Sequence, residues 1–205
     1  LGFEHIRLTV NWERPDRSSE TPPYTIKPEF MAQVKATVDF ALSKGLRVIL
    51  NMHNHDALMD NPDAMRPMFR EQWRQIAGAF KSYSDSLLFE ILNEPHGNIT
   101  AQKWNTLLVD ALTIIRQNAT PPSNNQHRCV LIGVVGDDIR SLEYPVHDKY
   151  TILTPHYYYP FRFTSQNTTA ATAPWKGTPW DDTEFEREQI RRYMDYIDAF
   201  AAPYN

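Results

Sequence analysis

Residues 87–95 read LLFEILNEP, and this stretch decides the fold class of the 205-residue chain. Its first six positions are almost continuously apolar, which is typical of a parallel β-strand that is covered on both faces. The run ends in an amide and a carboxylate, Asn93 and Glu94. Because the carboxyl ends of parallel strands meet at one edge of a sheet, the stretch predicts a buried strand that carries a polar site at its end.

Similar apolar runs recur at residues 6–10, 48–52, 130–135 and 151–154. Amphipathic segments with helical spacing separate them. Their apolar stripes are Phe30, Val34, Val38 and Ala41; Phe69, Trp73, Ile76 and Phe80; Trp104, Leu108, Leu112 and Ile115; and Phe185, Ile190, Met194 and Ile197 in a helix over about 184–202. Lys44 and Gly45 supply a stop for the first helix. Five strands alternating with helices predict parallel β/α units.

Two architectures are built from such units, the doubly wound sheet and the (β/α)8 TIM barrel. No glycine-rich phosphate turn follows a strand, which argues against the doubly wound sheet of nucleotide-binding proteins. Polar residues at four strand ends, Arg7, His53, Glu94 and His156, would converge on the mouth of a barrel. We therefore predict an α/β fold, with residues 1–205 forming one partial TIM-barrel domain. A full barrel needs about 250 residues, so we expect about strands 2 to 6, with at least one strand before residue 1 and two after residue 205.

The composition excludes several classes of protein. The formal net charge is -4, so no nucleic-acid partner is predicted. No apolar run approaches the ~20 residues needed to span a bilayer, which predicts a soluble protein with no membrane partner. The single cysteine, Cys129, rules out an internal disulfide. The N-terminus shows no secretory signal, and the sequence indicates no oligomeric state.

Glu94 is the candidate general acid. A carboxyl group surrounded by apolar strand residues has its charged form desolvated, so it can hold a proton near neutral pH. Protonation of a glycosidic oxygen requires such a group. Asn93 would offer a hydrogen bond to a sugar hydroxyl. The competing interpretation is that Glu94 and Pro95 only end a strand and begin a turn.

Two histidines follow the strand at residues 48–52. His53 could bind a sugar hydroxyl or orient a carboxylate, while His53 and His55 together have the spacing of two metal ligands on a strand. A metal-dependent barrel hydrolase that uses His53, His55 and His156 is therefore an alternative. The sequence argues against it, because no further strand end supplies a carboxylate ligand or a lysine. We predict no metal and no cofactor.

Aromatic residues follow the last strand, whose end reads HYYYP at residues 156–160. The next loop contains Phe161, Phe163, Trp175 and Trp180. Such a loop forms either a saccharide groove, because aromatic faces stack on sugar rings, or a small core of its own. Arg7 is a charged residue in an apolar strand, where an unpaired charge would be costly. We expect it to pair with a carboxylate.

Together these residues resemble glycoside hydrolase family 5, the cellulase-type β-glycanases. The resemblance runs in the family's order through IRLTV at 6–10, VILNMH at 48–53, LFEILNEPHG at 88–97 and HYYYPF at 156–161. It implies a TIM barrel that hydrolyses β-1,4-glucan or a related polysaccharide or oligosaccharide with retention, as an endoglucanase in a secreted or periplasmic location. By the family's pattern, Glu94 is the acid/base, Asn93 binds the sugar, and the residues that hold substrate and nucleophile are Arg7, His53, His156 and Tyr158.

Two of the chain's departures from the family's pattern bear on the candidate site. His53 is followed by Asn54 where the family usually has a second histidine, so Asn54 is expected at an altered substrate contact. The family's nucleophile is a glutamate at the end of the seventh strand, and no glutamate here matches it. We expect Glu90 to point away from the mouth by strand alternation, and Glu143, Glu184, Glu186 and Glu188 to lie on loop or helix surfaces. Residues 1–205 alone are therefore predicted to be inactive. The alternatives are a non-catalytic glycan-binding barrel and a β-mannanase or xylanase of the same family.

Overall fold

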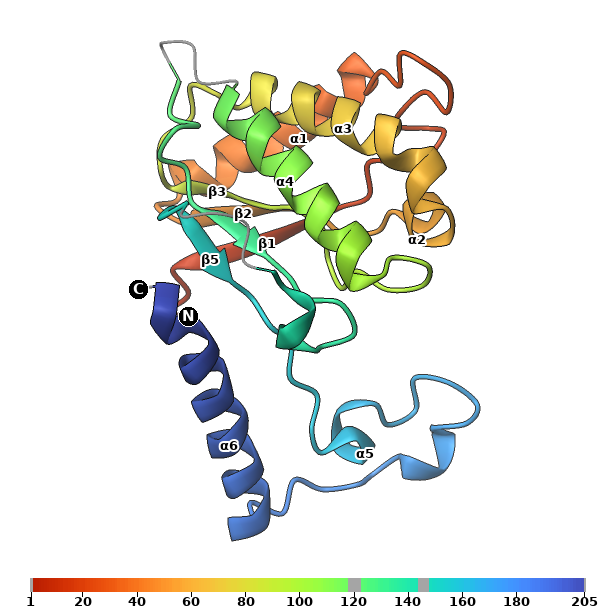
Figure 1. Cartoon of the computed structure of the whole chain (residues 1–205), viewed down its shortest axis with the longest axis vertical. Coiled ribbons are helices and arrows are strands. Elements are labelled where there is room, and N and C mark those ends of the chain that lie inside the picture. The colour runs from red at the N-terminus through yellow and green to blue at the C-terminus, as the bar shows by residue number, and fades with distance from the viewer. Residues whose placement is uncertain (1, 118–122, 144–147, 205) are drawn as a thin grey trace. The chain divides into compact units, whose positions relative to one another are not determined.

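The computed structural model describes residues 2–117, 123–143 and 148–204 (Figure 1). Its elements are, in chain order, β1 His5–Val10, α1 Pro28–Ser43, β2 Arg47–Met52, α2 Asp56–Asp60, α3 Pro62–Ala79, β3 Leu87–Glu90, α4 Ala101–Gln117, β4 Val130–Ile132, η1 Ile139–Ser141, β5 Thr151–Leu153, α5 Phe161–Thr164, η2 Ala173–Trp175, α6 Glu184–Ala201 and η3 Ala202–Tyr204. The chain divides into two compact units, Leu1–Pro155 and His156–Asn205. The assignment of residues 1–205 to one domain stays a prediction.

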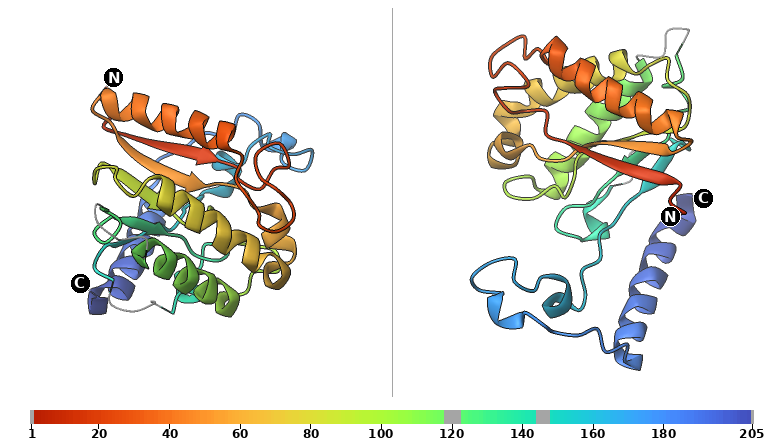
Figure 2. Two further views of the ribbon diagram at one scale, coloured as in Figure 1. Left: turned by 90° about the horizontal axis from the view of Figure 1, so that it is seen from above. Right: turned by 180° about the vertical axis from the view of Figure 1, so that it is seen from behind.

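The first unit is built on a five-stranded parallel sheet with the order β1-β2-β3-β4-β5. Helices α1, α3 and α4 lie together on one face of this sheet (Figures 1 and 2). A doubly wound sheet reverses its strand order at a switch point and carries helices on both faces, whereas a barrel winds in one direction only. The sheet is therefore part of a (β/α)8 barrel, and the predicted fold class is confirmed.

The core of the first unit lies between the sheet and these helices. Phe89 of β3 contacts Trp73 of α3, with ring centroids 5.7 Å apart, so alternate residues of β3 face the helices. The predicted stripe on α3 is at most 1% exposed at all four of its positions, Phe69, Trp73, Ile76 and Phe80. Because strand residues alternate between faces, Glu90 lies on the opposite face from Phe89. That opposite face would line the interior of a closed barrel.

Local signals in the sequence explain where the helices begin and end. Helix α1 stops as predicted, because Gly45 adopts a φ of +77° and donates its N–H to Leu42 O at 2.9 Å. Helix α3 begins at Pro62, and the preceding Asn61 side chain accepts a hydrogen bond from the N–H of Ala64 at 3.3 Å. The short helix α2, Asp56–Asp60, was not predicted from the sequence.

Two strands are shorter than the apolar runs that predicted them. Strand β3 ends at Glu90, although the run continues to residue 92. Strand β4 ends at Ile132, although its run continues to residue 135. After β4 the chain turns at Gly136 and Asp137, whose φ angles are +58° and +59°, and Val135 then forms an antiparallel bridge with Asp138. Hydrophobicity alone cannot locate such a turn, because the apolar residues before it remain buried.

A fully buried arginine holds the turn that leads into β3. Arg128 donates hydrogen bonds to the backbone oxygens of Phe80, Tyr83 and Leu87, and to the side chain of Asn125. Burial lowers the pKa of Arg128 to about 10, so the guanidinium still carries its charge at neutral pH. Because the Arg128 side chain satisfies several buried carbonyl groups, it fixes the start of β3, the strand that leads to the candidate site.

The second unit has little core of its own. Helix α6, predicted over about 184–202, begins with a capping box between Thr183 and Glu186 and contains no buried residue. Phe161 packs edge-on against Trp175, and Phe163 against Trp180, with centroids 6.0 and 5.8 Å apart. Phe161 and Phe163 nevertheless stay 49% and 37% exposed, so these ring pairs do not enclose a buried aromatic core. None of the helices in the described parts of the chain combines the length and apolar character needed to cross a membrane.

Candidate active site

The carboxyl ends of the first three strands lie side by side. The backbone N–H of His53 donates to Val10 O at 2.9 Å, and that of Asn93 donates to Met52 O at 2.9 Å. These hydrogen bonds continue the parallel pairing of β1, β2 and β3 beyond the strands themselves. His53 and Asn93 are therefore brought to the same edge of the sheet, where the polar residues of a barrel mouth are expected.

Arg7 lies at the centre of a charged network on the open face of the sheet. Its Nε donates to Glu90 Oε2 at 2.6 Å, and its Nη2 donates to Glu90 Oε1 at 2.5 Å. The same Nη2 also donates to Asn93 Oδ1 at 2.7 Å. The expectation that Arg7 pairs with a carboxylate is met by Glu90, whose side chain is only 1% exposed. Arg7 thereby connects a buried carboxylate to the residue that precedes Glu94.

The expectation that Glu90 points away from the polar strand ends was wrong. Alternation along β3 places Glu90 on the open face, because its neighbour Phe89 faces the helices. Thr9 pairs with Asn51, and Asn51 pairs with Glu90, so these residues share one sheet face with Arg7 two positions earlier in β1. A signal was present in the sequence, because Arg7, Asn51 and Glu90 are all polar residues inside apolar strands. Only the pairing shows that they meet.

His53 is oriented by a second polar residue on the open face. Its Nδ1 lies 2.9 Å from Asn51 Oδ1. Because an amide oxygen only accepts, Nδ1 carries the proton of this hydrogen bond, which fixes the plane of the His53 ring. Asn51 is fully buried, and sequence analysis had assigned it no role. Asn54, the predicted site of an altered substrate contact, is exposed.

Glu94 has a strained backbone that the surrounding structure holds in place. Its φ is +43°, a left-handed conformation that is costly for a residue with a β-carbon. The ring of His96 donates from Nδ1 to Glu94 O at 2.6 Å. Three residues after Glu94, a β-carbon on Gly97 would lie 2.9 Å from Met59 O in α2, so only glycine fits there. Asn98 completes the connection by donating its N–H to Met59 O at 2.8 Å.

The buried His55 side chain is held by a contact with Glu13. Its fully buried ring lies with Nδ1 2.7 Å from Glu13 Oε2. Nδ1 also lies 3.3 Å from the N–H of Leu58, but a protonated nitrogen cannot accept, and the shorter contact to the carboxylate decides its role. Glu13 accepts further hydrogen bonds from the N–H groups of Asp56 and Ala57, at 2.6 and 3.1 Å. Glu13 therefore caps α2, and nothing in the sequence indicates this contact between two loops.

Electrostatics at Glu13 follow from these contacts. Burial raises the pKa of the Glu13 carboxyl, but the hydrogen bond and charge of His55 and the two backbone N–H groups together lower it below its ordinary value. His53 and His55 thus have separate partners. No group of three or more side chains suited to hold a metal ion occurs among the described residues.

The remaining predicted site residues, His156 and Tyr158, belong to the second unit. Their rings lie 6.1 Å apart at an interplanar angle of 77°. Tyr193 of α6 donates its hydroxyl to His156 O at 3.0 Å and stacks against Tyr157, with centroids 4.8 Å apart. Helix α6 therefore supports the backbone that carries His156 and Tyr158. That these two residues join Arg7, His53 and Glu94 around one cleft stays a prediction.

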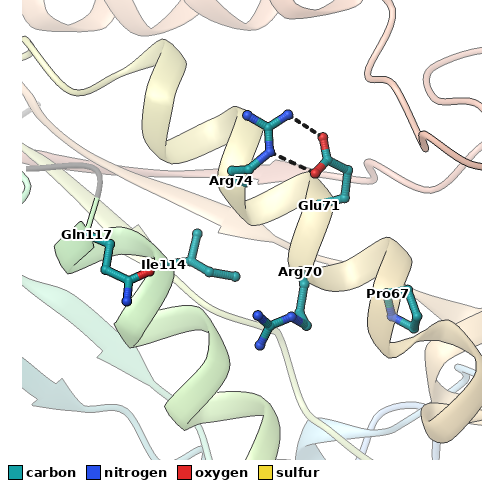
Figure 3. Close-up of a pocket in the computed structure, with 6 residues that line it drawn as sticks. All are labelled: Pro67, Arg70, Glu71, Arg74, Ile114 and Gln117. Carbon is teal, nitrogen blue, oxygen red and sulfur yellow. Dashed lines mark hydrogen bonds and ion pairs between the residues drawn. The ribbon is translucent and has the colours of Figure 1, made fainter.

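Two pockets in the described part of the chain do not include the strand-end residues of the candidate site. A pocket of about 490 Å³ lies between α3 and α4 and includes Arg70 and Ile114 (Figure 3). Arg74 and Glu71 in its wall pair with each other along α3. A further pocket of about 300 Å³ in the second unit is lined mainly by tyrosines, Tyr157, Tyr159, Tyr193 and Tyr196, together with Gln189 and Arg192. Neither contains the strand-end residues.

Comparison with known proteins gives a consistent result. Residues 1–202 match the family model described as cellulase, glycosyl hydrolase family 5. Endoglucanase H of Acetivibrio thermocellus is 34% identical over 205 residues, covering 98% of this chain and 21% of the relative. Endoglucanase A of Ruminococcus albus is 31% identical over 199 residues, covering 89% and 53%.

Solved structures show the same similarity. Endoglucanase Cel5A of the hyperthermophile Thermotoga maritima superposes with a TM-score of 0.89 at 33% identity, covering 98% of this chain and 64% of that protein. Structures of that enzyme are described in complex with cellobiose and with mannotriose. The chain thus spans between about a fifth and two thirds of the length of these relatives.

Proposed function

The chain belongs to glycosyl hydrolase family 5, the cellulase family, and on that premise we propose that it supplies the acid/base half of a retaining endo-β-1,4-glucanase. The substrate is a β-linked glucan, and the bond cleaved is the glycosidic C–O bond within the chain. The second carboxylate of the mechanism lies outside the residues described. Polymer hydrolysis further suggests a secreted or periplasmic enzyme of polysaccharide degradation.

The proposed mechanism assigns a separate task to each strand end. Glu94 protonates the leaving-group oxygen in the first step and removes a proton from water in the second. Asn93 binds a hydroxyl of the sugar whose bond is cleaved. Arg7 and His53 hold the substrate and the nucleophile. His156 and Tyr158 also bind the substrate, and Asn54 contacts an adjoining sugar. A retaining enzyme places its two carboxyl groups about 5–5.5 Å apart, so the nucleophile should face Glu94 across the mouth.

The observation that carries this proposal is the placement of Glu94. It follows a buried strand of a barrel-type sheet, at the edge where Arg7, His53 and Asn93 are also found. Its backbone is held at a φ of +43° by contacts to His96 and, through the following residues, to α2. Backbone strain that the surroundings maintain is found preferentially at active sites.

The test is hydrolysis of soluble β-1,4-glucan by the full-length protein, with the anomeric configuration of the first product followed by NMR. The expected product is the β-anomer, formed with a rise in reducing ends and a fall in viscosity. Binding to the polysaccharide without any release of reducing sugar would instead support the non-catalytic glycan-binding barrel. An α-anomeric first product would contradict the retaining mechanism.

A second substrate should be measured in parallel. Because the structurally similar Cel5A of Thermotoga maritima is described with both cellobiose and mannotriose, β-1,4-mannan is the strongest competing substrate. The ratio of kcat/KM for glucan and mannan decides between an endoglucanase and a β-mannanase, and xylan serves as the third member of the comparison. A ratio that favours glucan by tenfold or more, or about 1.4 kcal/mol, would establish the preference.

A further inference from the structure

Glu90 is a buried carboxylate for which the proposed reaction has no direct use. It lies four residues before Glu94, and its side chain is 1% exposed. A carboxylate removed from water is costly unless it is paired and hydrogen-bonded. Both oxygens of Glu90 are bound by Arg7, so the pair satisfies this condition at the floor of the candidate site.

The two contacts fix the plane of the Arg7 guanidinium. Binding through Nε and Nη2 forms a bidentate pair, which restricts the group more strongly than a single hydrogen bond. The same Nη2 lies 2.7 Å from the side chain of Asn93. Because arginine only donates, the Asn93 atom at this position must be the amide oxygen. The amide nitrogen of Asn93 is therefore turned away from Arg7 and offers its hydrogens as donors.

We propose that Glu90 is a positioning residue, which acts through Arg7 to orient the Asn93 amide and to neutralise the positive charge that Arg7 brings next to Asn93, the residue that precedes Glu94. This inference rests on the proposed roles of Asn93 and Glu94 and extends them. The orientation presents a donor, rather than an acceptor, to the sugar hydroxyl. The neutralisation matters because an uncompensated guanidinium close to a carboxyl group lowers its pKa. A general acid with a lowered pKa would lose its proton before it could act.

The experiment compares three variants of the full-length protein by their pH profiles of kcat/KM and by thermal unfolding. Glu90→Gln keeps the shape of the side chain and removes its charge. The alkaline limb of the profile, which reports the general acid, should move down by about 1 pH unit. Glu90→Asp keeps the charge but shortens its reach. Its alkaline limb should stay in place, while kcat falls roughly tenfold because Arg7 and Asn93 are displaced.

Asp110→Asn is the matched control. Asp110 is a second carboxylate, 7% exposed, that binds Arg66 and Arg70 between α3 and α4. Its loss should reduce thermal stability in the same way as the loss of Glu90. The pH profile and kcat should not change, because this ion pair lies on the helical layer and contacts no strand-end residue.

Two results would overturn the inference. One is a Glu90→Gln variant with a lowered melting temperature but the alkaline limb of the parent, which would make Glu90 a structural residue like Asp110. The other applies if Glu90→Gln does not fold: an unchanged kcat in Glu90→Asp would then show that Glu90 is a structural residue. A parent protein without any hydrolytic activity would refute the proposed function instead. The pKa of Glu94, measured by carbon-13 NMR in the parent and in Glu90→Gln, would then test the inference directly: a decrease supports it and no change refutes it.

Discussion

Helices α3 and α6 have the same length, 18 residues, and both carry an apolar stripe, yet they differ completely in burial. Helix α3 buries seven residues, and α6 buries none. Phe69 of α3 is 0% exposed, whereas Phe185 of α6 is 72% exposed. An amphipathic pattern thus identifies the face that a helix can bury, but burial also requires an opposing surface. The five-stranded sheet provides that surface for α3 in the first unit.

The same difference separates the two groups of candidate site residues. Arg7, His53 and Glu94 are attached to strands with a packed core behind them, so their geometry is held by many buried contacts. Tyr158 lies in the second unit and is 41% exposed. Catalytic geometry requires rigid support, so we expect the first unit to carry the chemistry and the second unit to adjust substrate binding.

Residues 1–205 alone are expected to lack the activity and the stability of a complete enzyme. We expect no release of reducing sugar from carboxymethylcellulose. Glu94 is the acid/base, and none of the other described carboxylates has been assigned as the nucleophile. We also expect aggregation or a broad thermal transition, since β1 and β5 are unpaired edges and the apolar side chains of α6 are exposed. Turnover that disappears in Glu94→Gln, or a sharp transition in a monomer, would contradict this prediction.

Glu94→Gln in the full-length protein should cause the largest loss from a single substitution. Removing the proton donor and later base should reduce the rate roughly 10²–10⁴-fold. The loss should be smaller for aryl glycosides with good leaving groups, which need little protonation. Rates of the glycosylation step across a series of leaving groups provide the measurement, and an equal loss for all of them would remove Glu94 from the acid/base role.

A pair of phenylalanine substitutions measures the difference in side-chain packing between the two units. Phe89→Ala should cost about 3–5 kcal/mol of unfolding free energy, because Phe89 is 0% exposed and packs against Trp73. Phe185→Ala should change the unfolding free energy by less than about 0.5 kcal/mol. Urea denaturation of the full-length protein measures both. A loss above about 2 kcal/mol at Phe185 would show that α6 packs against a further surface.

The smallest expected effect concerns Glu13 and pH. The folded-state pKa of Glu13 is below its value of 4.5 in an unfolded chain, so Glu13 stabilises the fold above that pH, and the contribution is lost as the pH falls through the folded-state pKa. Glu13→Gln should therefore cost about 1–2 kcal/mol at pH 7, and the difference from the parent should shrink below pH 4.5. Denaturation midpoints between pH 3 and pH 7 measure this. A difference independent of pH would show that Glu13 acts through its shape rather than its charge.

The sequence by itself determined the class of the fold and the identity of the candidate acid/base. Apolar runs of strand length and stripes of helical spacing are local properties, so five strands and the main helices could be located from them. LFEILNEPHG at residues 88–97 is likewise a contiguous signal, and it indicates Glu94 as the candidate without any information on distant contacts.

Only the tertiary structure decided which polar residues meet. Arg7 and Glu90 are 83 positions apart, and their pairing follows from the register of β1, β2 and β3. The contact of Glu13 with His55 joins two loops across 42 positions and likewise has no local signature. The physical reason is the period of two in a β-strand: a shift of one residue in register would send Glu90 to the opposite face from Arg7, and local hydrophobicity does not specify register between distant strands.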